Sequence, residues 1–370
     1  MNRRTLLKYL AFSTLTLPLI LNANENIQKN KNAKLILIEL KGGNDGLNTL
    51  IPYADPLYYK HRPNIAIQEK DVLKLNANLG LHPSLKELKE LFDLGEIAIF
   101  QGVGYENPNR SHFRSIEIWD TASKSNEYLD DGWVKSIKIQ NTSNIKGVVL
   151  GAEYGPLSGF ENGIIKIENI NSFLNKSKKL PNNLYLSSNN DALEHILRTE
   201  IEIKNSALKL EEKLKNTKPL KHSFEKNNFA QQMHIATQLI NAKTNIPFYK
   251  TSLASFDTHQ NQLNPHANLL KQLSQAIYTL RQNLIESGEW ENTTIMTYSE
   301  FGRRVEENAS KGTDHGTASV HFVIGGNVQG GLKGVYPPLS QLDSNRDLIY
   351  TTDFKERYSF SDRHETAKLM

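Results

Sequence analysis

The stretch that decides the fold is Lys34–Leu40, KLILIEL, which runs directly into KGGNDG at Lys41–Gly46. A short, almost continuous run of aliphatic and β-branched residues is typical of a central parallel strand whose two faces are covered by helices. The glycines and the Asn-Asp-Gly sequence that follow indicate a turn at the end of this strand. The sequence therefore predicts an α/β domain built outward from residues 34–40.

Further strands and helices alternate along the chain. Strands are predicted at Ile97–Gln101, Phe248–Asp257, Thr293–Tyr298 and Val320–Gly326, with shorter ones at 147–151, 163–170 and 184–187. Helices are predicted at Leu85–Phe92, Asn109–Trp119, 190–215, 224–242 and 266–287. This alternation favours a mostly parallel central sheet flanked by helices.

The predicted organisation is a single domain over residues 34–354, preceded by a polar linker at 24–33. Residues 125–245 are less regular and richer in lysine, which indicates an insertion or cap over the sheet. Residues 355–370 are polar, and their sequence indicates an atypical tail that is truncated or frameshifted.

The first residues have the pattern of an export signal. Arg3-Arg4 precede an apolar run over Tyr9–Leu21, which is shorter than the roughly 20 residues that cross a bilayer. Adjacent arginines before such a run are typical of a twin-arginine signal, here residues 1–23, so we expect the twin-arginine export machinery as a partner and a periplasmic or secreted location. The alternative is an uncleaved N-terminal membrane anchor.

Composition excludes several classes of protein. The chain of 370 residues contains no cysteine, which excludes disulfide scaffolds, thiolate metal sites and thiol nucleophiles. The formal charge of +4 comes largely from the predicted signal, and the remaining basic residues are interleaved with acidic ones. The sequence therefore favours no nucleic-acid partner, and any metal must be held by His, Asp or Glu.

Polar residues that could carry chemistry gather at or after the ends of predicted strands, where ligands bind in open α/β sheets. These groups are Asn44-Asp45, Arg110-Ser111-His112, Asp257-Thr258-His259, Glu300 with Arg303, and Asp314-His315-Gly316. Carboxylates and imidazoles converging on one rim suit a divalent metal with oxygen and nitrogen ligands. A serine at the start of a helix suits attack on an anionic ester, because free N–H groups favour negative charge there.

Each of these residues also has a structural explanation. Asp45 lies in a turn sequence, Ser111 is suited to capping a helix, and His259 and His315 could be ordinary packed histidines. His112 could orient Ser111.

Several motifs together resemble one family, the domain of unknown function 1501. They are Leu40–Asn48 (LKGGNDGLN), Leu81–Leu85 (LHPSL), Asn109–Phe113 (NRSHF), Phe256–Gln262 (FDTHQNQ), Tyr298–Arg304 (YSEFGRR), Gly312–Gly316 (GTDHG) and Thr351–Phe354 (TTDF). That family is similar to the alkaline phosphatase and sulfatase superfamily. The resemblance implies an alkaline phosphatase-like fold and a metal-dependent hydrolase, with the metal most simply zinc and otherwise manganese or calcium.

The resemblance also implies roles for individual residues. Asp45 resembles the first metal carboxylate, Ser111 the nucleophile with Ser115 as a weaker candidate, and Asp257 and His259 a metal pair. Two alignments place the last ligands, one through Asp314-His315-Gly316 and one through Ser299-Glu300-Phe301. We favour the second, in which Glu300 and His315 are ligands and Phe301 replaces a histidine.

The implied metal site thus comprises Asp45, Asp257, His259, Glu300, Asp314 and His315, enough for one metal but poorly suited to a second. Arg303, or else Arg110 or Arg114, would bind the anionic group. The leading hypothesis is an exported hydrolase of phosphate or sulfate esters. The alternative is a catalytically degenerate relative that serves as a periplasmic binding or assembly protein.

Overall fold

The computed structural model describes residues 32–137, 144–151, 153–180 and 191–357. Its centre is a nine-stranded sheet with the order β11-β5-β10-β9-β1-β8-β6-β7, and β12 pairs with β5. The strands are β1 (Lys34–Leu40), β5 (Ile97–Gly104), β6 (Gly147–Val149), β7 (Ile164–Lys166), β8 (Phe248–Leu253), β9 (Thr293–Tyr298), β10 (Ser319–Gly325), β11 (Gly331–Lys333) and β12 (Thr352–Asp353). The predicted mixed α/β fold with a mostly parallel sheet is confirmed.

Strand β1 lies in the middle of the sheet, as its sequence predicts. All seven of its residues are buried, and it pairs in parallel with β8 on one side and β9 on the other. Strand β10 is the exception to the parallel pattern, because it runs antiparallel to both β9 and β5. The loop entering β10 therefore lies at the same edge as the loops leaving β1, β5, β8 and β9.

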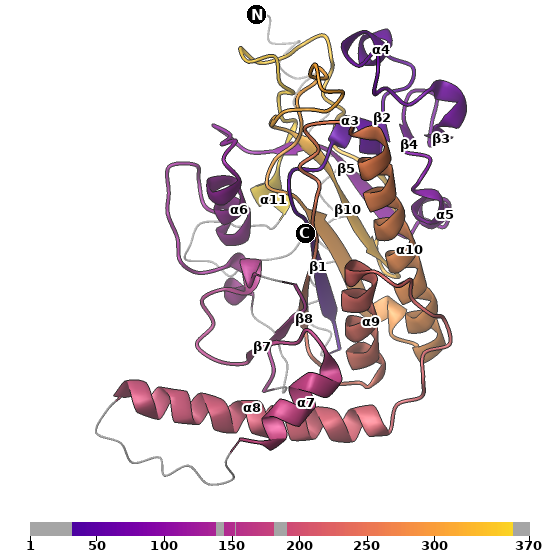
Figure 1. Ribbon diagram of the computed structural model, residues 1–370. Helices are drawn as coiled ribbons and strands as arrows, with labels where there is room; N and C mark the ends of the chain where they lie inside the picture. Colours follow the sequence, from indigo (N-terminus) through magenta and orange to yellow (C-terminus); the bar gives the residue numbers. More distant parts are fainter. Residues whose placement is uncertain (1–31, 138–143, 152, 181–190, 358–370) are drawn as a thin grey trace, which may run out of the picture.

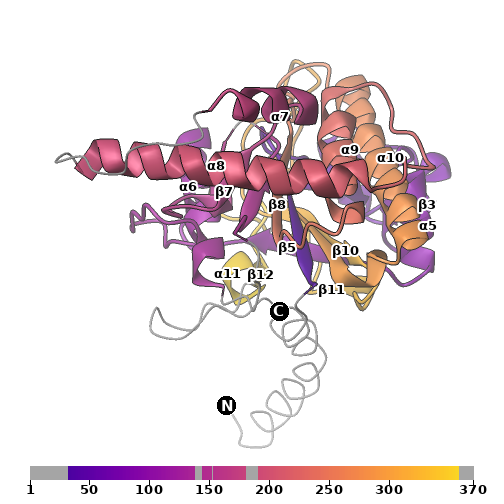
Figure 2. The ribbon, with the colours of Figure 1, turned by 90° about the horizontal axis from the view of Figure 1, so that it is seen from below.

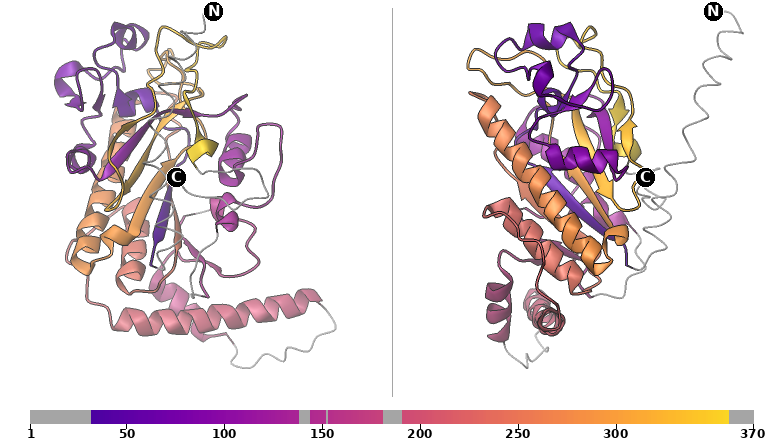
Figure 3. Two further views of the ribbon diagram at one scale, coloured as in Figure 1. Left: turned by 180° about the vertical axis from the view of Figure 1, so that it is seen from behind. Right: turned by 90° about the vertical axis from the view of Figure 1, so that its right-hand side faces the viewer.

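The two faces of the sheet carry separate cores. Ile36, Ile38 and Leu40 pack against α5 (Lys86–Asp93), α9 (Asn228–Asn241) and α10 (Leu263–Ser287). Leu35 and Leu37 belong to the opposite core, which includes Trp119 of α6 (His112–Thr121). Figure 1 shows α9 and α10 on one side of the sheet and α6 on the other, and Figure 3 shows α10 and α9 lying along one face.

The region expected to form a cap is partly integrated into the sheet. Strands β6 and β7 extend the sheet beyond β8, so residues 125–245 are not a separate layer. Helices α7 (Ile170–Lys178) and α8 (Asp191–Lys215) pack against each other, and Figure 2 shows them side by side. The strand predicted at 184–187 falls outside the described residues.

Smaller elements complete the fold near the start and end of the chain. A second sheet pairs β2 (Leu50–Ile51), β4 (Gly80–Leu81) and β3 (Leu73–Lys74), beside α3 (Gly46–Thr49) and α4 (Pro56–His61). Helix α11 (Phe354–Arg357) buries Phe354 against Trp119. Short 3-10 turns lie at Glu69–Asp71, Trp133–Ser136, Gly155–Leu157 and Trp290–Asn292.

The predicted signal and most of the predicted tail, residues 1–31 and 358–370, lie outside the described residues. Among the residues that are described, no helix combines the length and the apolar character needed to span a membrane.

Candidate metal centre

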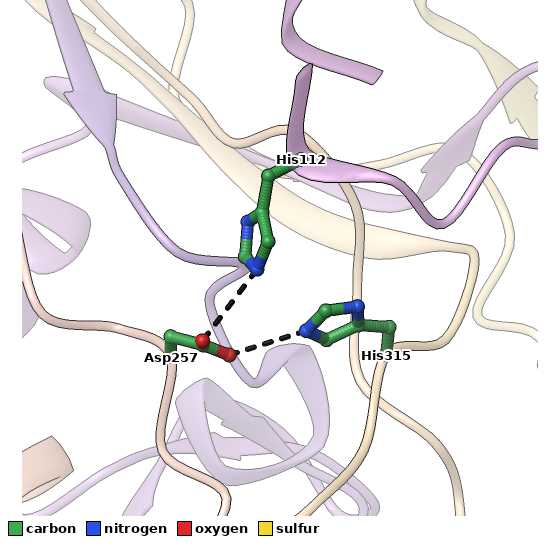
Figure 4. A group of neighbouring side chains, drawn as sticks. All are labelled: His112, Asp257 and His315. Carbon is green, nitrogen blue, oxygen red and sulfur yellow. Dashed lines mark hydrogen bonds and ion pairs between the residues drawn. The ribbon is translucent and has the colours of Figure 1, made fainter. Parts of the chain in front are cut away.

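Three side chains from distant parts of the chain meet at the edge where the parallel strands end. His112 lies in the first turn of α6 after β5, Asp257 follows β8, and His315 lies in the loop before β10. Their ligand atoms all lie within 4.8 Å of one another, and within the described residues this is the one group with metal-binding composition. Asp257 Oδ2 is 3.5 Å from His112 Nε2, and Asp257 Oδ1 is 3.2 Å from His315 Nε2 (Figure 4).

His259 adds a third imidazole to this group. Its Nε2 lies 2.9 Å from Asp257 Oδ1 and 3.1 Å from His315 Nε2. We call His112, Asp257, His259 and His315 the metal cluster. Its members are about one fifth to two fifths exposed, so the cluster is open to solvent on one side.

Hydrogen bonds fix the orientation of all three imidazoles. His315 Nδ1 lies 2.9 Å from the carbonyl oxygen of Arg110, and a carbonyl can only accept. His112 Nδ1 lies 3.0 Å from Glu300 Oε1, and His259 Nδ1 lies 3.0 Å from Asp314 Oδ1. Each Nδ1 is thus held by an outer acceptor, which directs each Nε2 toward Asp257.

The centre of the cluster suits a cation. The Nε2 atoms of His259 and His315 lie 3.1 Å apart, and both are close to the carboxylate of Asp257. A metal ion bound by these atoms would draw them together around one positive charge. The donor set, three imidazoles and one carboxylate, is one that suits zinc.

Spacing between the donors also fits a metal. Four ligands placed tetrahedrally at about 2.0–2.1 Å from zinc lie about 3.3 Å from one another. The separations within the metal cluster include 3.1 Å between two imidazoles, and 3.2 and 3.5 Å from imidazole to carboxylate. His112, Asp257 and His315 therefore offer three donors to a single metal ion, and His259 adjoins them through Asp257 and His315.

Arg303 holds Asp257 from within the protein. Its guanidinium is fully buried and donates to Asp257 Oδ1 at 2.7 Å, and to the carbonyls of Gly42, Gly43, Phe256 and Thr313. Partial burial raises the pKa of Asp257, but the hydrogen bond and charge of Arg303 outweigh it and hold that pKa below its usual value. Each of its three nitrogens donates within the protein, so this position favours a role in holding Asp257 over the predicted contact with the anionic group.

Glu300 supports the metal cluster by holding the imidazole of His112. It is buried, and Oε1 accepts the amide of Gly42 at 2.8 Å as well as pairing with His112 Nδ1. Its Oε2 is buried without a hydrogen-bond partner in the described part of the chain. Glu300 thus lies next to the metal cluster and holds one of its imidazoles, whereas the sequence predicted it as a direct ligand.

Asp314 has the same supporting position on the exposed side. Its carboxylate holds His259 Nδ1 and accepts from Asn308 at 3.1 Å. Partial burial raises the pKa of Asp314, but the hydrogen bonds from Asn308 and His259 outweigh burial, and the net pKa is below its usual value. The group is therefore a carboxylate at neutral pH.

Asp45 is not brought into the metal cluster. Its Oδ1 accepts the amides of Leu47 and Asn48 at the start of α3, and its Oδ2 pairs with Arg62 at 2.6 Å and with Gln262. Burial raises the pKa of Asp45, but Arg62 outweighs it and lowers the net value. Because this side chain is inaccessible and its oxygens are occupied, the structural explanation in the sequence fits better than a ligand role.

Ser111 lies between two residues that contact the metal cluster. It occupies the N-cap position of α6, yet its side chain makes no capping hydrogen bond and is exposed. The carbonyl of Arg110 on one side holds His315, and His112 on the other is a cluster member. Ser115 is buried and donates to the carbonyl of Asn109, which removes the weaker candidate.

A phenyl ring closes the floor of the metal cluster. Phe301 is buried, and its ring centroid lies 4.4 Å from that of His315 and 5.0 Å from that of His112. Gly43, at φ +84°, lets the ring approach, since a Cβ there would lie 2.4 Å from Phe301. This apolar floor and the enclosure of Asp45 leave the described residues with no second set of ligands.

His112 is the site residue that sequence reasoning did not identify as a ligand. The available signal was its place one residue after Ser111, at a helix start that follows a strand. From the sequence, that place predicts a side chain that orients the serine, whereas the fold directs the ring toward Asp257.

Comparison with known protein families identifies one family that matches this chain. The sequence profile of the family described as "Protein of unknown function (DUF1501)" matches residues 167–354. The chain belongs to this family. That match covers three of the four cluster residues, His112 lying before it. A comparison with curated proteins finds no match.

Solved structures resemble the chain weakly. A protein in the alkaline phosphatase superfamily from Vibrio parahaemolyticus is 12% identical, with 81% of this chain and 62% of that one covered and a TM-score of 0.36. The lipoteichoic acid synthase LtaP from Listeria monocytogenes is 11% identical, with 85% and 69% covered and a TM-score of 0.37.

The PsFucS1 sulfatase from Pseudoalteromonas sp. is 12% identical, with 84% and 66% covered and a TM-score of 0.38. The chain thus spans less than two thirds of the first of these three structures.

Proposed function

We propose that this protein is an exported, metal-dependent hydrolase of phosphate or sulfate esters. The observation that carries the proposal is the convergence of three imidazole Nε2 atoms on Asp257, each imidazole held through its Nδ1 by an outer acceptor. Outer hydrogen bonds of this kind are typical of metal-binding histidines. The exposed Ser111 hydroxyl beside the metal cluster supplies the nucleophile.

A metal bound here would supply Lewis-acid stabilisation of charge on the ester and favour ionised nucleophiles. Ser111 gives its hydroxyl proton to solvent and bonds to phosphorus or sulfur, while the bond from that atom to the ester oxygen breaks and the alcohol leaves with a proton from solvent. Water then bonds to the phosphorus or sulfur, the bond to Ser111 Oγ breaks, and phosphate or sulfate leaves as the serine hydroxyl regains a proton. The first amides of α6, which are not capped by Ser111, favour the negative charge of the transferred group.

Arg110 is the arginine best placed to bind the anion. The guanidinium of Arg303 is enclosed, and Arg114 is buried against the carbonyls of Lys124, Ser125 and Glu127. Arg110 pairs with Asp347 but keeps about a third of its side chain exposed beside Ser111.

Export through the twin-arginine machinery rests on the sequence of residues 1–23. A metal-binding fold is consistent with that route, which transports proteins that are already folded. The periplasmic or secreted location is therefore part of this proposal.

A second candidate is a degenerate relative that binds a partner or ligand without turnover. The observation that favours it is the buried Phe301 beneath the metal cluster, together with the pairing of Asp45 with Arg62. These leave one metal position in the described residues, whereas a two-metal clamp stabilises both the attacking and the leaving oxygen.

The test is metal analysis of the purified protein, followed by assays with chromogenic phosphate and sulfate esters. We expect close to one zinc or manganese per chain, loss of that metal in Asp257→Ala, and turnover that Ser111→Ala abolishes while metal content stays unchanged. A metal-free protein from metal-replete cells would contradict the proposal. Bound metal without turnover, or turnover unaffected by Ser111→Ala, would favour the binding protein.

A further inference from the structure

A pocket of about 490 Å³ opens directly beside the metal cluster. Asp257 and His259 of the cluster line it together with Asp314, so a group attached to an ester at the metal cluster extends into this space. The volume lies within the range of small-molecule sites, about 300–1,000 Å³.

The walls of the pocket contain hydroxyl and amide groups but no lysine or arginine. Ser255, Gln260 and Ser310 are exposed, and their side chains make no hydrogen bonds within the described residues. Two carboxylates, Asp257 and Asp314, face the same space. An anionic group would be repelled here, whereas a neutral group with several hydroxyls could use all of these donors and acceptors.

The walls are held in place by the backbone. Asn261 N donates to Ser310 O at 2.9 Å, Gln262 N donates to Lys311 O at 2.9 Å, and Thr313 N donates to Thr258 O at 3.2 Å. Gly312 is required for this approach, since a Cβ there would lie 2.2 Å from the carbonyl carbon of His259. These bonds tie the loop at 255–262 to the loop at 308–313, so the two walls are fixed relative to each other.

Several residues in the walls of this pocket have an unusual backbone conformation. Ser255 (φ +83°), Asn261 (φ +46°) and Lys311 (φ +56°) occupy the left-handed region without being glycine, and all three lie in the two loops that form the walls. Such conformations cost energy and persist where the surrounding structure holds them, often at binding sites.

From this lining we infer that the pocket binds the alcohol part of the substrate, and that this part is an uncharged, hydroxyl-rich group such as a sugar or polyol. The inference rests on the proposed function, because it names the substrate class of the same site. It excludes alcohol groups that carry a further negative charge.

The test compares two probes of similar size, glucose 6-phosphate and 6-phosphogluconate, which carries an added carboxylate. Binding is measured by calorimetry on zinc-loaded Ser111→Ala protein, in which turnover does not interfere. We expect glucose 6-phosphate to bind about tenfold more tightly or better, because the carboxylate of the other probe enters a pocket that is lined by Asp314 and by no lysine or arginine.

A charge placed in the wall should change this preference. Gln260→Lys, added to the same protein, should lower the ratio of affinities at least several-fold. Gln329→Lys is the matched control, since Gln329 is also exposed but follows β10 at the strand end away from the metal cluster. Equal affinities for the two probes, absence of binding by glucose 6-phosphate, or equal ratios in the two lysine variants would overturn the inference.

Turnover by the unmodified protein is measured separately. If the preference and its sensitivity to Gln260→Lys are found but no ester is hydrolysed, the pocket assignment stands and the proposed hydrolase function fails.

Discussion

Asp45 and Asp257 follow neighbouring parallel strands at the same edge of the sheet, yet their surroundings are opposite. Asp45 is fully enclosed, caps α3 and pairs with a buried arginine. Asp257 is 42% exposed and faces three imidazoles, with one arginine holding it from behind. A carboxylate whose oxygens are both occupied by protein donors stabilises the fold, whereas one that faces several imidazole nitrogens and is open to solvent is suited to bind a cation.

The largest effect is expected at the enclosed carboxylate. Asp45→Ala leaves the charge of Arg62 buried without its partner, and we expect it to lower the free energy of unfolding by about 3–5 kcal/mol. Denaturant unfolding measures the loss. Asp55→Ala is the control, because Asp55 caps α4 through Leu57 N and has no such ion pair, so about 1 kcal/mol is expected there. Similar losses in the two variants would remove the distinction between capping and ion pairing.

Asp257→Asn should have the opposite effect: stability should change little, whereas metal affinity should fall. The amide oxygen can still accept from Arg303, so we expect the free energy of unfolding in chelator to change by less than about 1 kcal/mol. Metal affinity, measured by competition with a chromophoric chelator, should fall about 100-fold or more, since a charged donor is lost. A folded Asp257→Asn protein that retains wild-type metal affinity would show that Asp257 is not a ligand.

Removing the charge of the supporting carboxylate should have a smaller effect. Glu300→Gln keeps an acceptor for His112 Nδ1 but removes the buried charge, and about a tenfold loss of metal affinity is expected. Asp314→Asn at the exposed imidazole is the comparison, and its effect should be weaker because solvent screens it. An equal or larger loss in Asp314→Asn would place the more important support on the exposed side.

The smallest expected effect concerns pH near Asp45. Burial lowers the pKa of His266, which contacts Asn44, to about 4, and that of His82 to about 3. Because the folded pKa lies below the unfolded value of about 6.5, the unfolded chain binds more protons as pH falls, and stability is lost below that pH. From pH 7 to 5.5 we expect a loss of about 1 kcal/mol for each histidine.

Chemical denaturation at the two pH values tests this expectation. His266→Asn should reduce the pH dependence by about half, while His234→Asn on α9, farther from this buried network, should reduce it less. A pH dependence that is unchanged in His266→Asn would contradict the assignment of the lost stability to this group.

Local sequence patterns predicted most of the fold. The apolar run of β1, the leucine face of α10 and the boundaries of β9 follow from short-range periodicity, because burial on one or two faces fixes residue type at each position. The antiparallel direction of β10 and the pairing of β6 and β7 with the main sheet were not predicted. Both depend on contacts between strands that are distant in the sequence.

Sequence by itself determined which loops carry chemistry, since polar residues at strand ends must meet at one edge of a parallel sheet. It also restricted any metal to nitrogen and oxygen ligands, because the chain has no cysteine. Only the tertiary structure decided which carboxylate is available. Arg62 and Gln262, 17 and 217 residues from Asp45, occupy its oxygens, while the turn at the start of α6 brings His112 to Asp257. Accessibility and charge pairing depend on these long-range contacts, and local residue patterns contain no information about them.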